Sequence, residues 1–160
     1  YGQNNNQLIL PEFIKKTKGN NVFNLEDKIE FVNYDNYGNP QEIKKADGTS
    51  VLYFWSTRRN PIFKIVGLTY NQFLASINSS GINISENMTS LEVESLYNLF
   101  PNANIYRYKY KGLTDLITSM TDARGQTVYY EYDEFNRLKH VKDEDGNILS
   151  ENQYHYSTQN

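Results

Sequence analysis

The sequence predicts a mainly β fold (β-rich α+β): an antiparallel β-hairpin or meander array with a two-helix insert. Aromatic content, alternation at period two and regularly spaced glycine turns predict it. The 160 residues include 14 Tyr and 8 Phe, which suit the pleated surface of a strand. Because one core typically serves a chain of this length, we expect a single domain over residues 1–160, with β structure over 1–67 and 104–160 and a helical insert over 68–103.

Alternating side chains mark the strands. Tyr106, Tyr108 and Tyr110 alternate with Arg107 and Lys109, as expected for strands with one half-buried face. The same alternation and the turns between the runs predict strands over residues 29–34, 41–45, 50–55, 62–66, 105–110, 116–121, 127–133, 137–142 and 148–156.

The hydrophobic spacing changes to three or four residues between positions 67 and 104, which indicates helices. A short helix is expected over residues 70–77. A second helix would be capped by Thr89 or Ser90 and ended by Pro101. Its apolar stripe would comprise Leu91, Val93, Leu96, Leu99 and Phe100.

The chain also repeats itself. Segments 34–48 and 132–146 match at one offset of 98 residues, and a partial third copy runs from residue 122 to 132. In that copy Asp122 and Gly125 precede Asp143 and Gly146 by 21 residues. This length is about two short strands with their turns, so each copy is predicted to be one β-hairpin.

Two kinds of turn are expected. The dipeptides Asp47-Gly48 and Asp145-Gly146 are typical of tight two-residue hairpin turns, because Gly accepts positive φ and Asp bonds nearby amides. Residues 36–39 and 123–126 are expected to form looser turns between hairpins. Asp35 and Asp133 follow repeat tyrosines, and such recurring carboxylates are expected to bond turn amides.

The run Tyr130-Glu-Tyr132-Asp133-Glu-Phe-Asn136-Arg137-Leu138, continued to Gly146, resembles the RHS/YD-repeat family. Asn136 replaces the family's Gly, a mild change because Asn also visits the left-handed region. The segments from residue 34 and from residue 132 are also similar to the C-terminal parts of large Bacteroidetes RHS proteins. The motif positions are Tyr34, Asp35, Gly38, Asp47, Gly48, Asp122, Gly125, Tyr130, Tyr132, Asp133, Arg137, Leu138, Val141, Asp143, Gly146, Tyr154 and Tyr156.

The resemblance implies a non-catalytic structural and interaction module of a large secreted or cell-surface bacterial protein. Its first partners would be adjacent repeats of the same polypeptide. Large family members form a shell around a C-terminal cargo and cleave themselves near an Asp-Pro sequence. No Asp precedes Pro here, so neither the cleaving core nor a cargo domain is expected in this chain.

Charge and composition exclude several classes. The formal net charge of −3 argues against nucleic acid as a partner, and the apolar runs are too short to span a membrane. With no Cys and only His140 and His155, no cofactor or metal is expected. Residues 143–147 have some features of a calcium loop, but the spacing favours a hairpin turn.

Three functions remain open. The first is the structural and interaction module. The second is a carbohydrate-binding module, or a contact for another surface protein, in which Tyr106, Tyr108, Tyr110 and Trp55 stack on a ligand. The third is a hydrolase with an unrecognised carboxylate pair. We favour the first and expect no enzymatic activity.

Overall fold

The computed structural model describes residues 2–3, 9–17, 25–57, 60–112 and 114–155. It confirms the predicted fold class, because antiparallel strands dominate and two helices form a small insert. The chain forms two compact units, unit 1 (Tyr1–Ile105) and unit 2 (Tyr106–Asn160). The unit boundary falls within strand β8 (Asn104–Tyr110), close to the end of the predicted helical insert.

Unit 1 begins with strands that the sequence analysis missed. β1 (Gly2–Gln3) pairs with β2 (Ile9–Leu10), and β3 (Phe13–Thr17) pairs with β4 (Leu25–Tyr34). The search for alternating apolar and polar residues missed β3 and the start of β4, because charged cross-strand pairs replace that alternation there. Lys15 pairs with Asp27 in the register, and their side chains form an ion pair of 3.0 Å.

The remaining strands of unit 1 confirm the predicted ranges to within one residue. They are β5 (Pro40–Lys45), β6 (Ser50–Trp55) and β7 (Pro61–Val66). From β3 to β7, each strand pairs antiparallel with the next in the sequence. This is the meander of hairpins that the sequence predicted.

Both predicted helices are present, as α1 (Tyr70–Ser80) and α2 (Ser90–Leu99). Each begins with a capping box, formed by Thr69 with Gln72 in α1 and by Thr89 with Glu92 in α2. Reciprocal side-chain and backbone hydrogen bonds of this kind satisfy amides that lack helical partners. Of the two residues proposed to cap the second helix, Thr89 is therefore the one that does so.

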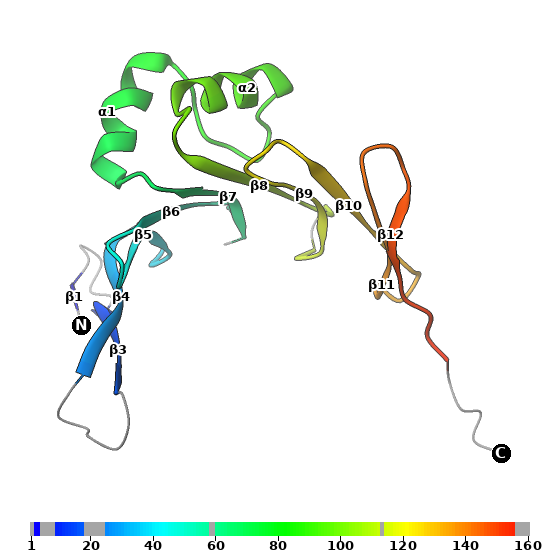
Figure 1. Cartoon of the computed structure of the whole chain (residues 1–160), viewed down its shortest axis with the longest axis horizontal. Helices are drawn as coiled ribbons and strands as arrows, with labels where there is room; N and C mark the ends of the chain where they lie inside the picture. Colours follow the sequence, from blue (N-terminus) through cyan, green and yellow to red (C-terminus); the bar gives the residue numbers. More distant parts are fainter. Residues whose placement is uncertain (1, 4–8, 18–24, 58–59, 113, 156–160) are drawn as a thin grey trace. The chain divides into compact units, whose positions relative to one another are not determined.

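The two helices lie against one face of the unit 1 sheet (Figure 1). Phe73 of α1 joins the layers, with its ring centroid 4.7 Å from that of Phe54 on β6 and 5.3 Å from that of Phe100 after α2. The buried hydrophobic side chains are Val51, Leu52, Ile62, Phe63, Ile65, Phe73, Ile77, Met88, Leu96, Phe100 and Ile105.

The predicted apolar stripe of the second helix was wrong at one position. Leu91 is 75% exposed, whereas Leu96 is fully buried. At 3.6 residues per turn, five positions place these side chains roughly 140° apart around the helix axis. A stripe that buries Leu96 and Phe100 therefore leaves Leu91 facing solvent.

Glu42 connects the sheet to the helical insert. Its side chain is 5% exposed and accepts hydrogen bonds from the Ser50 hydroxyl (2.8 Å), the Tyr70 backbone N–H (3.1 Å) and the Asn33 amide (3.4 Å). These donors come from β6, the first residue of α1 and β4. The buried carboxylate thus holds three elements of unit 1 together.

Unit 2 contains most of β8 (Asn104–Tyr110), followed by β9 (Ile117–Thr121), β10 (Thr127–Tyr132), β11 (Leu138–Lys142) and β12 (Ile148–Glu151). These strands pair antiparallel in chain order. The predicted strand over 148–156 is shorter than expected, and Tyr156 lies outside the described residues. Among the described residues of unit 2 there is no helix and no buried hydrophobic side chain.

None of the helices in the described ranges combines the length and the hydropathy that a membrane span requires.

Candidate functional site

The repeated aspartates close a recurring five-residue turn. In the turn Asp133–Arg137, the Asp133 N–H donates to the Arg137 carbonyl at 2.9 Å, and the Asn136 N–H donates to the Asp133 carbonyl at 3.0 Å. Asp133 Oδ1 accepts the N–H groups of Phe135 and Arg137, both at 2.9 Å. The turns that begin at Asp35, Asp122 and Asp143 have the same four hydrogen bonds.

The fourth residue of each aspartate turn has positive φ. It is Gly38 (83°), Gly125 (83°) and Gly146 (84°), and in the remaining turn it is Asn136 (60°). Asn136 is the residue that departs from the family's Gly. It adopts the required left-handed conformation, which Asn tolerates better than most residues with a side chain.

The second carboxylate oxygen bonds the side chain of the fifth residue in three of these turns. Asp133 Oδ2 accepts from Arg137 Nε at 2.7 Å, and the equivalent bonds from Asn39 and Asn147 are 2.8 and 2.9 Å long. The Arg137 side-chain bond, with bonds from turn amides, lowers the pKa of Asp133. The side chain of each of these aspartates is therefore engaged with its own turn.

The prediction of two kinds of turn was wrong. Lys45–Thr49 has the same two backbone hydrogen bonds, each 2.9 Å long, as the aspartate turns. Gly48 has φ 83° at its fourth position, and Asp47 accepts the Thr49 N–H at 2.9 Å. The Asp-Gly dipeptides thus occupy the third and fourth positions of a five-residue turn. This turn needs positive φ at its fourth position only, and Gly adopts that conformation easily.

The turn that follows β6 was also missed by the sequence analysis. The Ser56 N–H donates to the Asn60 carbonyl at 2.7 Å, and the Ser56 hydroxyl accepts the Asn60 N–H at 3.1 Å. A Ser hydroxyl thus replaces the Asp carboxylate. The signal in the sequence is Trp55-Ser56, an aromatic residue before a turn residue, as in Tyr34-Asp35.

Four aromatic side chains donate hydrogen bonds to backbone carbonyls that are distant in the sequence, and we call each such contact an aromatic latch. The Tyr132 hydroxyl donates to the Ile117 carbonyl, and Tyr154 donates to Leu138, both at 2.9 Å. In unit 1 the Trp55 indole N–H donates to the Pro40 carbonyl at 2.8 Å. The fourth latch runs from the Tyr34 hydroxyl to the Pro11 carbonyl.

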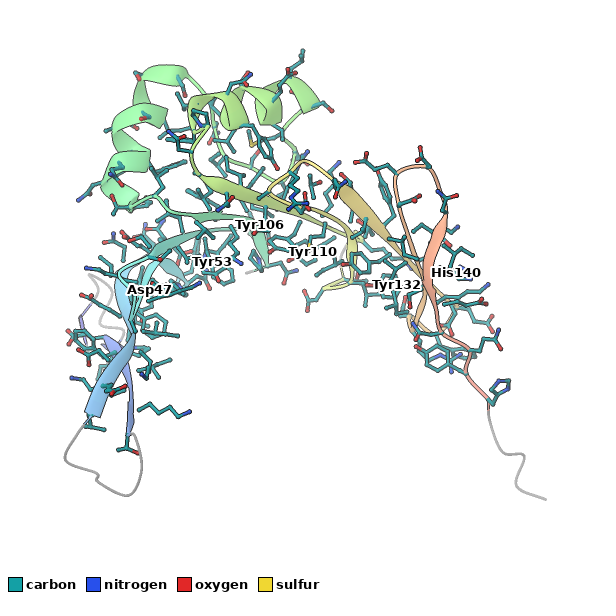
Figure 2. All side chains as sticks on the ribbon, in the orientation of Figure 1. Asp47, Tyr53, Tyr106, Tyr110, Tyr132 and His140 are labelled. Atoms are coloured by element: carbon teal, nitrogen blue, oxygen red, sulfur yellow. The ribbon has the colours of Figure 1, made fainter. Side chains whose placement is uncertain are left out.

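The rings proposed to stack on a ligand are Tyr106, Tyr108, Tyr110 and Trp55 (Figure 2 labels Tyr106 and Tyr110). All four are half-buried. Burial, with smaller contributions from Tyr108 and Asp115, raises the pKa of Tyr110 to about 12. The Arg58-Arg59 pair next to Trp55 in the sequence lies outside the described residues.

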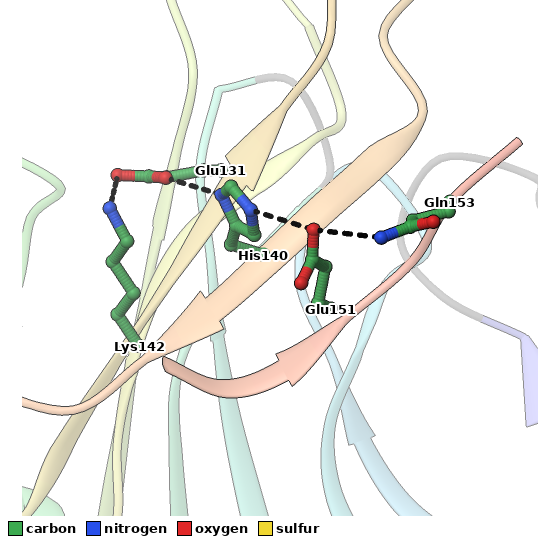
Figure 3. A network of polar contacts seen from close by, with 5 residues as sticks. All are labelled: Glu131, His140, Lys142, Glu151 and Gln153. Carbon is green, nitrogen blue, oxygen red and sulfur yellow. Dashed lines mark hydrogen bonds and ion pairs between the residues drawn. The ribbon is translucent and has the colours of Figure 1, made fainter. Parts of the chain in front are cut away.

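His140 is the centre of a polar row across β10, β11 and β12 (Figure 3). Its Nδ1 lies 3.0 Å from Glu131 Oε2, and its Nε2 lies 3.8 Å from Glu151 Oε1. Lys142 contacts the other oxygen of Glu131 at 2.6 Å. Hydrogen bonds from Lys142 and then His140 lower the pKa of Glu131. The row connects three strands by polar side-chain contacts, as cross-strand pairs do.

Arg137 forms a second cluster in unit 2. Its guanidinium lies 4.9 Å from the Phe135 ring centroid and 4.4 Å from that of Tyr154. An open groove of about 480 Å³ lies beside this stack. The groove is lined by Tyr132, Asp133, Glu134, Arg137, Lys139, Glu151, Asn152, Gln153 and Tyr154.

The described residues bring no three or more His, Asp or Glu side chains together as a metal site. Asp35 and Asp133 lie in separate turns of different units, and each bonds its own turn amides. His155 is exposed. The geometry of the motif residues is therefore that of hairpin closure.

The fold and the turns define a protein of β-hairpin repeats. Residues 114–148 match the RHS Repeat family, and this segment contains the turns that begin at Asp122, Asp133 and Asp143. The resemblance to RHS repeat proteins is thus confirmed for this segment. A search of curated proteins found no match.

Proposed function

We propose that this chain is a non-catalytic structural and interaction module, a C-terminal-type segment of a large Bacteroidetes RHS protein that is secreted or displayed on the cell surface. The recurrence of one hydrogen-bonded turn in both units is the observation that carries this proposal. A group needed once per structural unit serves the unit's geometry, because a catalytic group is needed once per site.

The use of the polar groups supports the absence of catalysis. Asp133 and Asp143 each accept backbone N–H groups of their own turns. His140 contacts Glu131 and Glu151 within a cross-strand row. A general base must instead reach a substrate proton. Asp35 is engaged in its turn in the same way, so the repeat aspartates are not a carboxylate pair set aside for hydrolysis.

Adjacent repeats of the same polypeptide are the proposed partners, since hairpins stabilise one another by extending a sheet. Nucleic acid and membrane insertion have no part in this proposal. Carbohydrate, or another surface protein, is the alternative ligand of the half-buried tyrosines. A glycan array tests that alternative: binding that is lost in both Tyr106→Ala and Tyr108→Ala would favour it over a purely structural role.

The structural role is tested by Asp133→Asn, with the neighbouring exposed Glu134→Gln as the matched control. Because the folded state lowers the pKa of Asp133, its carboxylate stabilises the fold above the ordinary carboxyl range. That stability is lost as the pH falls through the folded-state pKa. We expect Asp133→Asn to accelerate amide hydrogen exchange in β10 and β11 at neutral pH. The substitution should also weaken the change in these exchange rates as the pH falls.

Glu134→Gln should leave both the exchange rates and their pH dependence close to those of the unchanged chain. If the two variants behave alike, the Asp133 carboxylate does not support the hairpin and the structural proposal loses its main observation. NMR-detected exchange is the suitable measurement, because it reports on β10 and β11 separately from unit 1.

A further inference from the structure

We propose that the polar row of His140 is a pH-sensitive switch, in which protonation of the imidazole strengthens the hold of β11 on β12. The row comprises Glu131 on β10, His140 and Lys142 on β11, and Glu151 on β12. Such a response to acid goes beyond the proposed function, which needs the row only as a contact between strands.

Both ring nitrogens of His140 face a carboxylate (Figure 3). Nδ1 lies 3.0 Å from Glu131 Oε2, and Nε2 lies 3.8 Å from Glu151 Oε1. The strand register produces these contacts, because His140 lies opposite Glu131 on β10 and opposite Glu151 on β12. Tyr129, which shares a face of β10 with Glu131, lies opposite Lys142 instead. The imidazole side chain is 15% exposed, so most of its surface is covered.

Only the protonated ring suits both of these carboxylates. An imidazolium carries an N–H on each nitrogen, whereas a neutral imidazole carries one N–H and a lone pair on the other nitrogen. If the neutral ring donates to Glu131, the lone pair of Nε2 faces the Glu151 carboxylate. The other tautomer transfers the same conflict to Glu131. Deprotonation therefore replaces one of the two attractions by a repulsion.

The other charges of the row assign this repulsion to the contact with β12. Lys142 contacts Glu131 Oε1 at 2.6 Å and lowers the pKa of that carboxyl, so Glu131 has a cation of its own. Among the described side chains, His140 is the only cationic partner of Glu151, since Gln153, at 3.5 Å, offers a neutral amide. The row thus sets two carboxylates against one ammonium, and a protonated His140 makes it neutral.

The switch should act over the pH range in which imidazoles take up a proton. Between about pH 5.5 and about pH 8, imidazole is the side chain that ordinarily changes its charge. The chain has two His, His140 and His155, and no Cys. Since only the protonated ring serves both carboxylates, the contact with β12 should be complete at the acid end of this range and be lost as the pH rises.

Amide hydrogen exchange of the whole chain, followed by NMR at about pH 5.5 and about pH 8, tests the switch. After division by the intrinsic rate at each pH, exchange in β11 and β12 should be about threefold slower at the lower pH. The effect is modest because both carboxylates are 46% exposed. His140→Gln should remove the difference, whereas His155→Gln, at the other and exposed His, should retain it. Equal corrected rates in the unchanged chain overturn the inference, and so does a difference that survives His140→Gln.

Glu151→Gln provides a second test that retains the imidazole. The amide introduced by this substitution can donate to the lone pair of the neutral Nε2, so deprotonation no longer opposes the contact. We expect β12 to exchange more slowly than in the unchanged chain at about pH 8 and to lose most of its pH dependence. Glu134→Gln, which alters an exposed carboxylate outside the row, is the matched control and should keep the full dependence. The same dependence in Glu151→Gln as in the control overturns the inference.

Discussion

Unit 1 holds every buried hydrophobic side chain of the described residues, whereas unit 2 holds none. Both units are built from the same antiparallel hairpins with the same turn. The difference is the helical insert, which places Phe73, Ile77 and Leu96 on one sheet face of unit 1. The hairpin motif is thus compatible with two different ways of stabilising a sheet.

In unit 1 stability comes from a covered core, because removing apolar surface from water is the largest favourable term in folding. In unit 2 the described contacts are distributed along the surface. They are carboxylates bonded to turn amides, the aromatic latches, the Arg137 stack and the polar row of His140. Each such contact contributes little alone, so the comparison predicts a stable unit 1 and a more easily opened unit 2.

The substitution Phe63→Ala in β7 is the most direct test of the difference in stability between the two units, and it has the largest expected effect. Phe63 is fully buried, and truncating such a side chain costs about 3–5 kcal/mol because a cavity remains. Urea unfolding followed by the fluorescence of Trp55, the one Trp of the chain, reports on unit 1.

The control for Phe63→Ala is Val128→Ala in unit 2. Val128 is half-buried and pairs with Met120 on β9. Its truncation should cost about 1 kcal/mol or less, the range of one cross-strand pair, and should leave the Trp55 transition in place. Equal effects of the two substitutions on that transition would mean that the helices do not create a separate core.

A smaller effect is expected from Glu42→Gln. The amide nitrogen of Gln cannot accept a hydrogen bond, so either Ser50 loses its acceptor at Oε1 or Tyr70 and Asn33 both lose theirs at Oε2. Replacing a buried, hydrogen-bonded charged group in this way should cost about 2 kcal/mol in the free energy of unfolding. The measurement is again urea unfolding followed by Trp55. Glu94→Gln on the exposed side of α2 should change stability little, and an equal loss in both variants would contradict the role given to Glu42.

The strands and turns could be predicted because their signals are local. The alternation of side chains predicted the bounds of the strands from β5 to β11 to within one residue. Asp and Gly residues predicted the positions of most of the turns. Each of these features depends on residues that are close together in the sequence. The helices also follow from local spacing, and Thr89 is recognisable as a candidate cap from the sequence around it.

The features that escaped prediction depend on partners that are distant in the sequence. The aromatic latch from Trp55 to Pro40 spans fifteen residues, and Glu42 meets Tyr70 across twenty-eight. The register shifts beside the turns, as at Glu131/Tyr132, leave no mark in the alternation. Alternation at period two indicates the face of the sheet on which a side chain lies, but it does not indicate which neighbouring strand that side chain contacts.

The smallest expected effect concerns Tyr110, and it sharpens the comparison. Unit 2 has no buried hydrophobic residue among those described, yet burial raises the pKa of Tyr110 from its usual 10.0 to about 12. A raised tyrosine pKa means that the fold favours the neutral phenol. Its contribution to stability is therefore complete below pH 10 and is lost as the pH rises through about 12.

Ultraviolet titration of the phenolate absorbance should show one tyrosine that ionises later than the rest, and Tyr110→Phe should remove that last step. Tyr129→Phe is the control, because Tyr129 is 46% exposed on β10, and it should leave the last step in place. If Tyr110→Phe instead removes signal near pH 10, the aromatic side chains of the sheet do not exclude water. The stability of unit 2 would then depend on its turns and latches alone.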